Sequence, residues 1–534
     1  MNRIYPIILL ALLTSFFTNQ GFGQSRFSLK WGNEFKGIAK AHITGVLKVD
    51  DGGYLLQGEW DHGEYGQGHA QPEYLQRISN QLTQKGLWEY PEKNKTENET
   101  FFFEKFVSLK SGLYMFETGF NKKAEADVLY ASKVQDEKSS VAANRSKLMT
   151  VPHGKKEYGS DFRIDYSYDG TKVLIINKHR VKSKEPEQFD LIIYDDAFNV
   201  VWKKEVTLPF PNDKFHITSW MVDDDANVYI IGKKIDKEGG GIWTYREAEG
   251  HFMVLAYNDN GKKEISMDLS FDQDAYIKSI DLKIVDKNII DVVGFYSKEK
   301  FGAGTDGVFS LTMDLNTKQN SKIRREPFPF EIVSMDMSER KKERAKKKEE
   351  AGKRDYELPQ YVMNEVILND DGSRTILAEN SYLVVTTHNT GNGGSYTTYT
   401  YYNNNVLVIN IDKEGKFEWF AVVPKLQRSE NEEKYSGYAY IKKNGYLYIL
   451  YNEHVENLQR DYGNYRNFQV MGKDAILAMA TISPTGKVSR EEVCRAEKIA
   501  VDLRPRIFQQ VSESELLIAG RYKDMEQYGI FTIK

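Results

Sequence analysis

The stretch NIIDVVGFYSKEKFGAGTDGVFSLTMDL, residues 288–315, sets the pattern for the whole chain. Residues 289–295 and 307–314 are rich in branched and aromatic side chains, which favour strands. The segment between them contains glycine and lysine and is typical of a loop. A degenerate copy ends the chain, with ELLIAGRY at 515–522 and YGIFTIK at 528–534. The sequence therefore predicts a repeated antiparallel unit.

The unit recurs along the chain. Second strands of the repeat are predicted to begin at Tyr54, Leu113, Val173, Val228, Ile289, Thr375, Tyr446 and Leu516. The first five are 55–61 residues apart and the later ones 70–86. Inner strands are predicted to precede them, at 101–107, 162–167, 215–222 and 437–441. Turns such as Asp-Gly and Asn-Gly, which tolerate positive φ, lie between the two strands. Third and fourth strands are predicted as hairpins at 75–88, 191–202, 252–261, 406–419 and 476–488.

With four strands in a repeat of this length, the chain resembles a secreted multi-bladed β-propeller. The resemblance implies an all-β fold, a β-propeller of about eight four-stranded antiparallel blades, in one domain over residues 25–534. Seven blades remain an alternative if one weak repeat is an insertion. The last repeat (503–511, 515–521 and 528–534) lacks an outer strand. Residues 27–31 are predicted to supply it, so that the N- and C-terminal strands pair and close the ring.

Residues 1–24 are expected to be a signal peptide, with Arg3 followed by the apolar run 7–17. A retained anchor is the alternative, although the run is short for a membrane span. We therefore expect an exported protein, periplasmic or extracellular, that meets the membrane only through this segment. Cys494 is the single cysteine, so no internal disulfide can form, and a buried strand position is expected for it. The formal net charge of -4 argues against a nucleic-acid partner.

Two insertions interrupt the repeat. The first, 335–356, is predicted to contain a charged helix, with nine Lys/Arg against four Glu between residues 339 and 354. It is interpreted as a solvated helix between blades, or alternatively as a basic arm for an anionic partner. The second, 387–405, is predicted to be a Tyr-, Asn- and Gly-rich loop. It is interpreted as an elongated hairpin tip, or as a loop that binds a ligand. The candidate binding residues are His388, Tyr396, Tyr399, Tyr401 and Tyr402.

Metal and cofactor signals are weak. His62 and His69 are the best metal candidates, but their spacing matches no zinc signature, and a polar loop is the preferred interpretation. No cofactor is expected. The spacing Asp412–Gly415–Trp419 is similar to the tryptophan-docking motif of eight-bladed quinoprotein dehydrogenases. The adjacent cysteine pair of many such enzymes cannot exist in this chain, which has one cysteine.

Two functions are therefore considered, and no catalytic residue is assigned. The first is a non-catalytic binding or scaffolding propeller of the periplasm or cell envelope, expected to be a monomer, which contacts a protein or glycan through loops on one face. The alternative is a hydrolase or lyase that acts on a polysaccharide, with carboxylates at the central channel. Two carboxylates gathered with an Arg or His at the channel would favour the enzyme.

Overall fold

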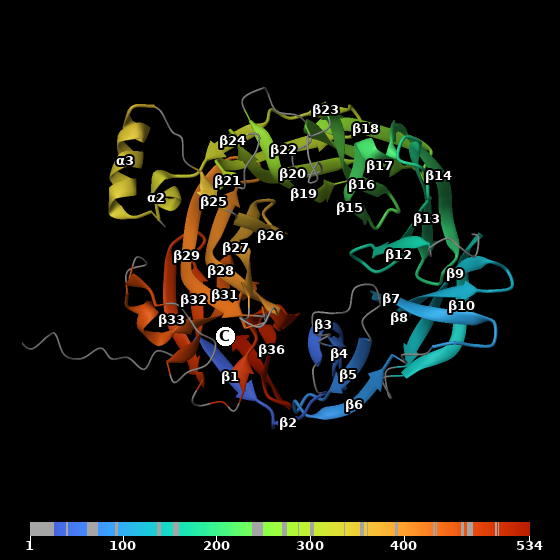
Figure 1. Cartoon of the computed structure of the whole chain (residues 1–534), viewed down its shortest axis with the longest axis horizontal. Helices are drawn as coiled ribbons and strands as arrows, with labels where there is room; N and C mark the ends of the chain where they lie inside the picture. Colours follow the sequence, from blue (N-terminus) through green and yellow to red (C-terminus); the bar gives the residue numbers. More distant parts are fainter. Residues whose placement is uncertain are drawn as a thin grey trace, which may run out of the picture.

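Eight antiparallel sheets of four or more strands are arranged in a ring in the described part of the chain (Figure 1), and a small two-stranded sheet pairs β21 (Gly304–Thr305) with β25 (Leu358–Pro359). The computed structural model describes residues 26–38, 41–60, 73–90, 94–135, 140–152, 160–237, 249–269, 275–286, 288–299, 304–335, 337–352, 357–359, 361–389, 394–430, 433, 435–460, 464–466, 474–496, 499 and 501–534. The chain is an eight-bladed β-propeller, as the repeat pattern predicts, and the seven-blade alternative is wrong. The predicted signal peptide and the candidates His62 and His69 lie outside the described residues.

The first four blades follow one another along the chain. They are β3 (Ala41–Asp50), β4 (Gly53–Trp60), β5 (Glu73–Ile78) and β6 (Gln84–Glu89); β7 (Glu99–Leu109), β8 (Gly112–Asn121), β9 (Ala126–Gln135) and β10 (Ser140–Pro152); β11 (Asp161–Tyr166), β12 (Lys172–Lys178), β13 (Pro186–Asp195) and β14 (Val200–Pro211); β15 (Phe215–Val222), β16 (Val228–Lys237), β17 (Glu249–Asn258) and β18 (Lys263–Leu269).

The other four blades carry the insertions and the two ends of the chain. They are β19 (Tyr276–Asp286), β20 (Ile289–Ser297), β22 (Gly307–Asp314), β23 (Gln319–Asn320) and β24 (Arg324–Pro327); β26 (Tyr361–Leu368), β27 (Arg374–Asn389), β28 (Ser395–Ile411) and β29 (Phe417–Glu430); β30 (Ala439–Lys443), β31 (Tyr446–His454), β32 (Ala475–Ile482) and β33 (Val488–Arg495); β34 (Asp502–Leu503), β35 (Gln509–Ser512), β36 (Glu515–Tyr522), β37 (Met525–Ile533), β1 (Phe27–Trp31) and β2 (Phe35–Lys36). All eight second strands begin within one residue of the predicted position.

Turn residues and apolar runs explain why the chain folds into these hairpins. Asn444 and Gly445 join β30 to β31 with φ of 51° and 75°, the conformation that tight hairpin turns require. The middle strands are buried on both faces, as in β32, where all eight residues are buried. A strand covered on both sides reads as a continuous apolar run, which is how the sequence revealed these strands.

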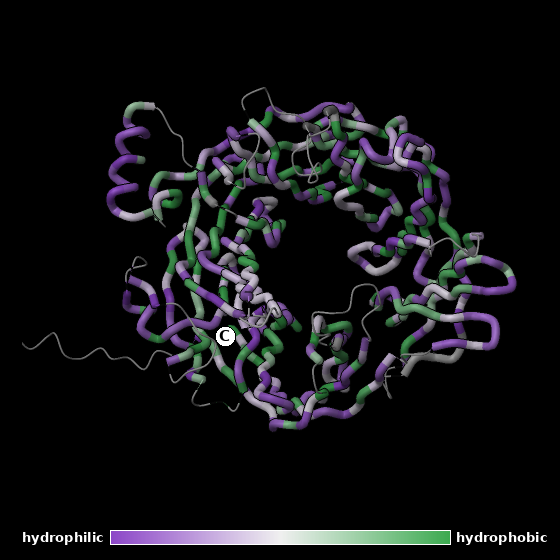
Figure 2. The backbone as a smooth tube through the Cα atoms, viewed as in Figure 1, coloured by the Kyte–Doolittle hydropathy of each residue, from purple (hydrophilic) through white to green (hydrophobic). Residues whose placement is uncertain are grey.

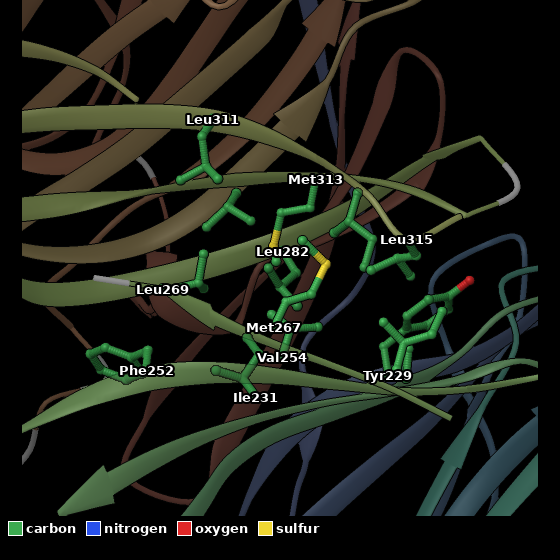
Figure 3. Close-up of a cluster of buried hydrophobic side chains, with 14 of the residues drawn as sticks. Tyr229, Ile231, Phe252, Val254, Met267, Leu269, Leu282, Leu311, Met313 and Leu315 are labelled. Atoms are coloured by element: carbon green, nitrogen blue, oxygen red, sulfur yellow. The ribbon is translucent and has the colours of Figure 1, made fainter. Parts of the chain in front are cut away.

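Each blade shares an apolar core with the next one. Between the fourth and fifth blades, Val254 and Met267 pack with Leu282, Leu311 and Met313 (Figure 3). Equivalent cores join every other pair of neighbouring sheets, including the last with the first, where Leu517 and Tyr528 meet Ala41 and Tyr74. The burial of these side chains is the main stabilising contribution to the ring.

The two ends of the chain pair as predicted. β1 lies antiparallel to β37, with partners from Phe27↔Ile533 to Trp31↔Gly529. Arg521 of β36 is buried and donates hydrogen bonds to the carbonyl oxygens of Ile38 and Ala41, at the entrance to the first blade. These contacts tie the eighth sheet to the first.

Tryptophans in outer strands dock on the following blade. Trp202 Nε1 donates to the carbonyl oxygen of Ala226 at 2.8 Å, and Trp419 Nε1 donates to that of Pro484 at 3.0 Å. Gly486 adopts a φ of 78°, and a Cβ there would lie 2.7 Å from the Trp419 ring. Each of these two tryptophans thus fixes the outer strand of its blade to a turn of the following blade.

The first insertion is a charged helix, as predicted. The short α2 (Phe330–Val333) leads to α3 (Glu339–Glu350), which projects from the outside of the ring (Figure 1). Ala345 is the one buried residue of α3, and the helix is largely hydrophilic (Figure 2). Within the described residues, no helix is both long and apolar enough to cross a membrane.

In residues 387–389 and 395–405, the second insertion is strand, so the loop prediction is wrong for them. β27 and β28 continue as paired strands from Ser381↔Asn403 to Asn389↔Ser395, which agrees with the hairpin interpretation. β29 extends alongside as far as Thr400↔Glu430. The alternating Thr and Tyr residues favour strands, and this preference outweighs the loop signal from the neighbouring Asn and Gly residues.

Candidate functional site

A cavity of about 330 Å³ opens at the inner wall of the ring, where the sixth, seventh and eighth blades meet. β26, β27, β30, β35 and the single-turn helix η6 (Pro505–Ile507) contribute to it. Its lining comprises Asn364, Glu365, Glu379, Gly437, Tyr438, Ala439, Tyr440, Arg506, Phe508, Gln509, Gln510 and Leu516. The lining combines carboxylates, amides, phenols and one guanidinium with a few apolar side chains.

Glu379, which lines the cavity, forms a buried ion pair with Lys425, which does not. Lys425 of β29 is fully buried, and its Nζ donates to Glu379 Oε1 at 2.6 Å. Nζ also donates to the Asn403 carbonyl oxygen at 2.6 Å and to Gln427 Oε1 at 2.9 Å. Burial lowers the pKa of Lys425, while the neighbouring Glu379 carboxylate opposes that change. All three ammonium protons thus have acceptors, which a buried charge requires.

Arg506 reaches the same carboxylate from the eighth blade. Its Nη2 lies 3.6 Å from Glu379 Oε2 and 2.8 Å from Glu433 Oε1, and it donates to Asn403 Oδ1 at 2.8 Å. Gly437 adopts a φ of 80°, and a Cβ there would lie only 3.1 Å from the guanidinium. Glycine therefore lets the Arg506 side chain pack against the start of β30.

Two tyrosines and a second carboxylate, Glu365, also line the cavity. Tyr438 and Tyr440 are two residues apart, so they project to the same side of the extended chain. Tyr438 Oη donates to Asn364 Oδ1 at 3.2 Å. Burial, followed by the charge of Glu365, raises the pKa of Tyr440 to about 12. Both phenols therefore remain protonated at neutral pH and can donate hydrogen bonds.

Glu453 of β31 is a second buried carboxyl group near Lys425. Its Oε1 accepts hydrogen bonds from the His454 backbone N–H at 2.9 Å and from Asn457 Nδ2 at 2.8 Å. Oε2 has no hydrogen-bond partner in the described part of the chain. Burial raises the pKa of Glu453 to about 7, although these hydrogen bonds and the nearby Arg490 and Lys425 lower it. A buried, titratable carboxyl group of this kind makes stability depend on pH.

Glu453→Gln is expected to flatten the pH dependence of stability. Because the folded-state pKa of about 7 exceeds the usual carboxyl value, the folded protein binds the extra proton between about pH 4.5 and 7. Its unfolding free energy therefore falls as pH rises through this window. Urea unfolding at pH 5 and pH 8 gives the difference in unfolding free energy between the two pH values. In Glu453→Gln this difference should be smaller than in the unmodified protein by on the order of 3 kcal/mol. The exposed control Glu513→Gln should keep the full difference. If the unfolding free energies of the two variants depended equally on pH, Glu453 would not be the group responsible.

The residues proposed from sequence lie elsewhere, on the extended hairpin. His388 and Tyr396 stack with ring centroids 4.6 Å apart, and Tyr402 stacks on Tyr382 at 4.7 Å. Tyr399 and Tyr401 occupy the odd-numbered positions of β28 and therefore face the opposite side of the hairpin. The five candidates are thus divided between two faces, and none of them lines the cavity.

The cavity residues were missed because they come from three blades. Glu379 and Arg506 are 127 positions apart in the chain, so no spacing motif links them. One local signal was present: Lys425 and Gln427 interrupt the apolar alternation AVVPKLQ of residues 421–427. Polar side chains at inward positions of a buried strand indicate a buried polar network.

No cluster of three or more His, Cys, Asp or Glu residues suited to a metal ion occurs among the described residues. Cys494 lies half-buried on β33 and packs against the core between the seventh and eighth blades. It occupies a strand, as expected, but it is half-buried and not buried as predicted.

The comparisons with known proteins concern the fold. The chain matches no family model and none of the curated proteins. It is similar to the WD40 domain of SCAP from fission yeast, at 10% identity and a TM-score of 0.40, over 95% of both chains. It is also similar to an ACO/RPE65 chimera, at 8% identity and a TM-score of 0.37, over 94% of this chain and 93% of that one. The β-propeller domain of the Trilobed protease from Pyrococcus furiosus matches at 10% identity and a TM-score of 0.30, over 74% of this chain and 96% of that one.

Proposed function

We propose that this chain is a non-catalytic binding propeller that takes a saccharide, as a free glycan or as part of an envelope polysaccharide, into the cavity between the sixth and eighth blades. The observation that carries the proposal is the lining of that cavity. Phenol, amide, carboxylate and guanidinium groups offer both donors and acceptors to hydroxyl groups, and the Tyr440 ring offers a flat apolar face. We further propose that the protein is exported to the periplasm or cell surface and acts there as a monomer.

The alternative is a polysaccharide hydrolase or lyase. Glu365, Glu379 and Arg506 do line one cavity, which is the arrangement that such an enzyme needs. Glu379, however, has Lys425 at 2.6 Å from one oxygen and Arg506 at 3.6 Å from the other. Both oxygens of Glu379 are thus engaged by cationic side chains of the protein, so this carboxylate is not presented to a substrate as a free acid–base group. The geometry therefore favours binding over acid–base chemistry.

A glycan array followed by calorimetric titration of the best ligand tests the proposal. Tyr440→Ala should weaken binding at least about tenfold, since it removes an aromatic contact inside the cavity. Tyr166→Ala removes a tyrosine from the corresponding first strand of the third blade and should leave affinity unchanged. Equal effects of the two variants, or no glycan bound at all, would overturn the proposal. Release of new reducing ends by the unmodified protein, abolished by Glu365→Gln, would instead establish the enzyme.

A further inference from the structure

A second cavity, of about 310 Å³, lies between the turns of the sixth and seventh blades. It shares no lining residue with the saccharide cavity. Its base is apolar, with Ile367, Leu447 and Ile482, and two aromatic residues line it, Trp419 and Tyr446. Tyr446 is 40% exposed, so this part of the lining is accessible from solvent.

One wall of this cavity is a continuous hydrogen-bonded chain. Asn410 Nδ2 donates to Glu418 Oε2 at 2.5 Å, and Asn410 Oδ1 accepts from Thr375 Oγ1 at 3.2 Å. Thr375 Oγ1 in turn accepts from Asn369 Nδ2 at 3.1 Å.

The chain then turns toward the second carboxylate. Asn369 Nδ2 also donates to Ser373 Oγ at 2.8 Å, and Ser373 Oγ donates to Asp371 Oδ1 at 2.7 Å. The hydroxyl protons of Ser373 and Thr375 are therefore directed at groups within the wall. The same chain connects the carboxylates of Asp371 and Glu418.

The polar groups on this wall that the hydrogen-bonded chain does not use are acceptors. Asn369 Oδ1 is buried and has no hydrogen-bond partner in the described part of the chain. The free carboxylate lone pairs of Asp370, Asp371 and Glu418 also belong to this lining. The hydrogen bonds from Ser373 lower the pKa of Asp371, so this carboxyl group is ionised at neutral pH. Three acidic residues face a single basic one, Lys442, and the lining has an excess of negative charge.

We propose that this cavity binds a cationic group on an apolar stem, an ammonium or guanidinium ion. The acceptor-rich wall supplies hydrogen bonds that only a donor-bearing ligand can complete. Excess negative charge selects a cation over an anion, and the Trp419 and Tyr446 rings add cation–π attraction. The apolar base takes the stem. Such a group comes from a free amine or from a basic side chain of a peptide, and both sources share this chemistry.

Titration of the full chain with three probes, followed by ligand-observed NMR, tests the assignment. The probes are 2-phenylethylammonium as the free amine, acetyl-Gly-Arg-Gly-amide as the peptide, and 3-phenylpropionate as a shape-matched anion. At least one cation should bind at least about tenfold more tightly than the anion, and its affinity should fall with added salt. Binding of the amine alone identifies a free amine as the source, and binding of the peptide alone identifies a basic side chain.

Substitutions of the charged residues that line this cavity test whether the cation binds there. Glu418→Gln combined with Asp370→Asn should weaken the cationic probe about tenfold or more. Lys442→Gln should strengthen it, because it removes a like charge. Asp259→Asn, in the turn between β17 and β18 of the fourth blade, should have no effect on binding. The positive φ of 51° at this position suits asparagine, so the control should fold normally. Equal affinity for the anion, or an unchanged affinity in the Glu418/Asp370 variant, would overturn the proposal.

Discussion

Lys425→Met is expected to lower the free energy of unfolding by about 3–5 kcal/mol. Lys425 is fully buried, and its Nζ has three acceptors within 2.9 Å. Methionine fills a similar volume but leaves the Glu379 carboxylate, which is 2% exposed, without its main counter-charge. Equilibrium unfolding in guanidinium chloride measures the loss directly.

Two further variants separate the ion pair from simple packing. Lys413→Met, on the exposed turn before β29, should change stability by less than about 0.5 kcal/mol. The double change Lys425→Met with Glu379→Leu should recover much of the loss, because it removes both buried charges together. A Lys425→Met effect no larger than that of Lys413→Met would show that the pair contributes nothing.

Deletion of residues 27–32 is expected to cause aggregation or a fall in melting temperature of several degrees. The deletion removes all of β1 and exposes the edge of β37, whose unpaired backbone groups can recruit other chains. It also removes the stacking of Phe27 on Phe531, whose ring centroids lie 5.5 Å apart, and the contacts of Leu29 and Trp31 with the core of the last two blades. The single cysteine means that no disulfide within the chain can hold the ends together. Differential scanning calorimetry with light scattering measures both outcomes.

Deletion of residues 341–348 is the matched control. This slightly longer segment lies in α3, where Ala345 is the only buried residue. Its loss should shift the melting temperature far less than the loss of β1. Equal effects of the two deletions would mean that pairing of the terminal strands does not stabilise the ring.

The sequence by itself determined the repeat and predicted the pairing of the two ends, and it favoured eight blades while leaving seven as an alternative. Strand type and turn type are local properties: branched and aromatic residues favour extended backbone, and Asn-Gly or Asp-Gly supplies positive φ at the turn. The strand begun at Ile289 and the turn at Asn444 could therefore be placed without knowledge of any neighbour. The charged helix α3 was predictable for the same reason, since its residues are good helix formers with little to bury.

Only the tertiary structure decided where the polar groups gather. Glu379, Lys425 and Arg506 belong to two blades, and Asn369, Asn410 and Glu418 meet through hydrogen bonds between strands. Strand pairing within the sixth blade brings the second set together, and packing of the eighth blade against the sixth adds Arg506 to the first. In the hairpin that carries His388 and Tyr396, the opposite happens. The tyrosines are close together in the sequence, but strand alternation separates them onto two faces. Strand pairing and blade packing bring together side chains that are distant in sequence, and no spacing along the chain records that proximity.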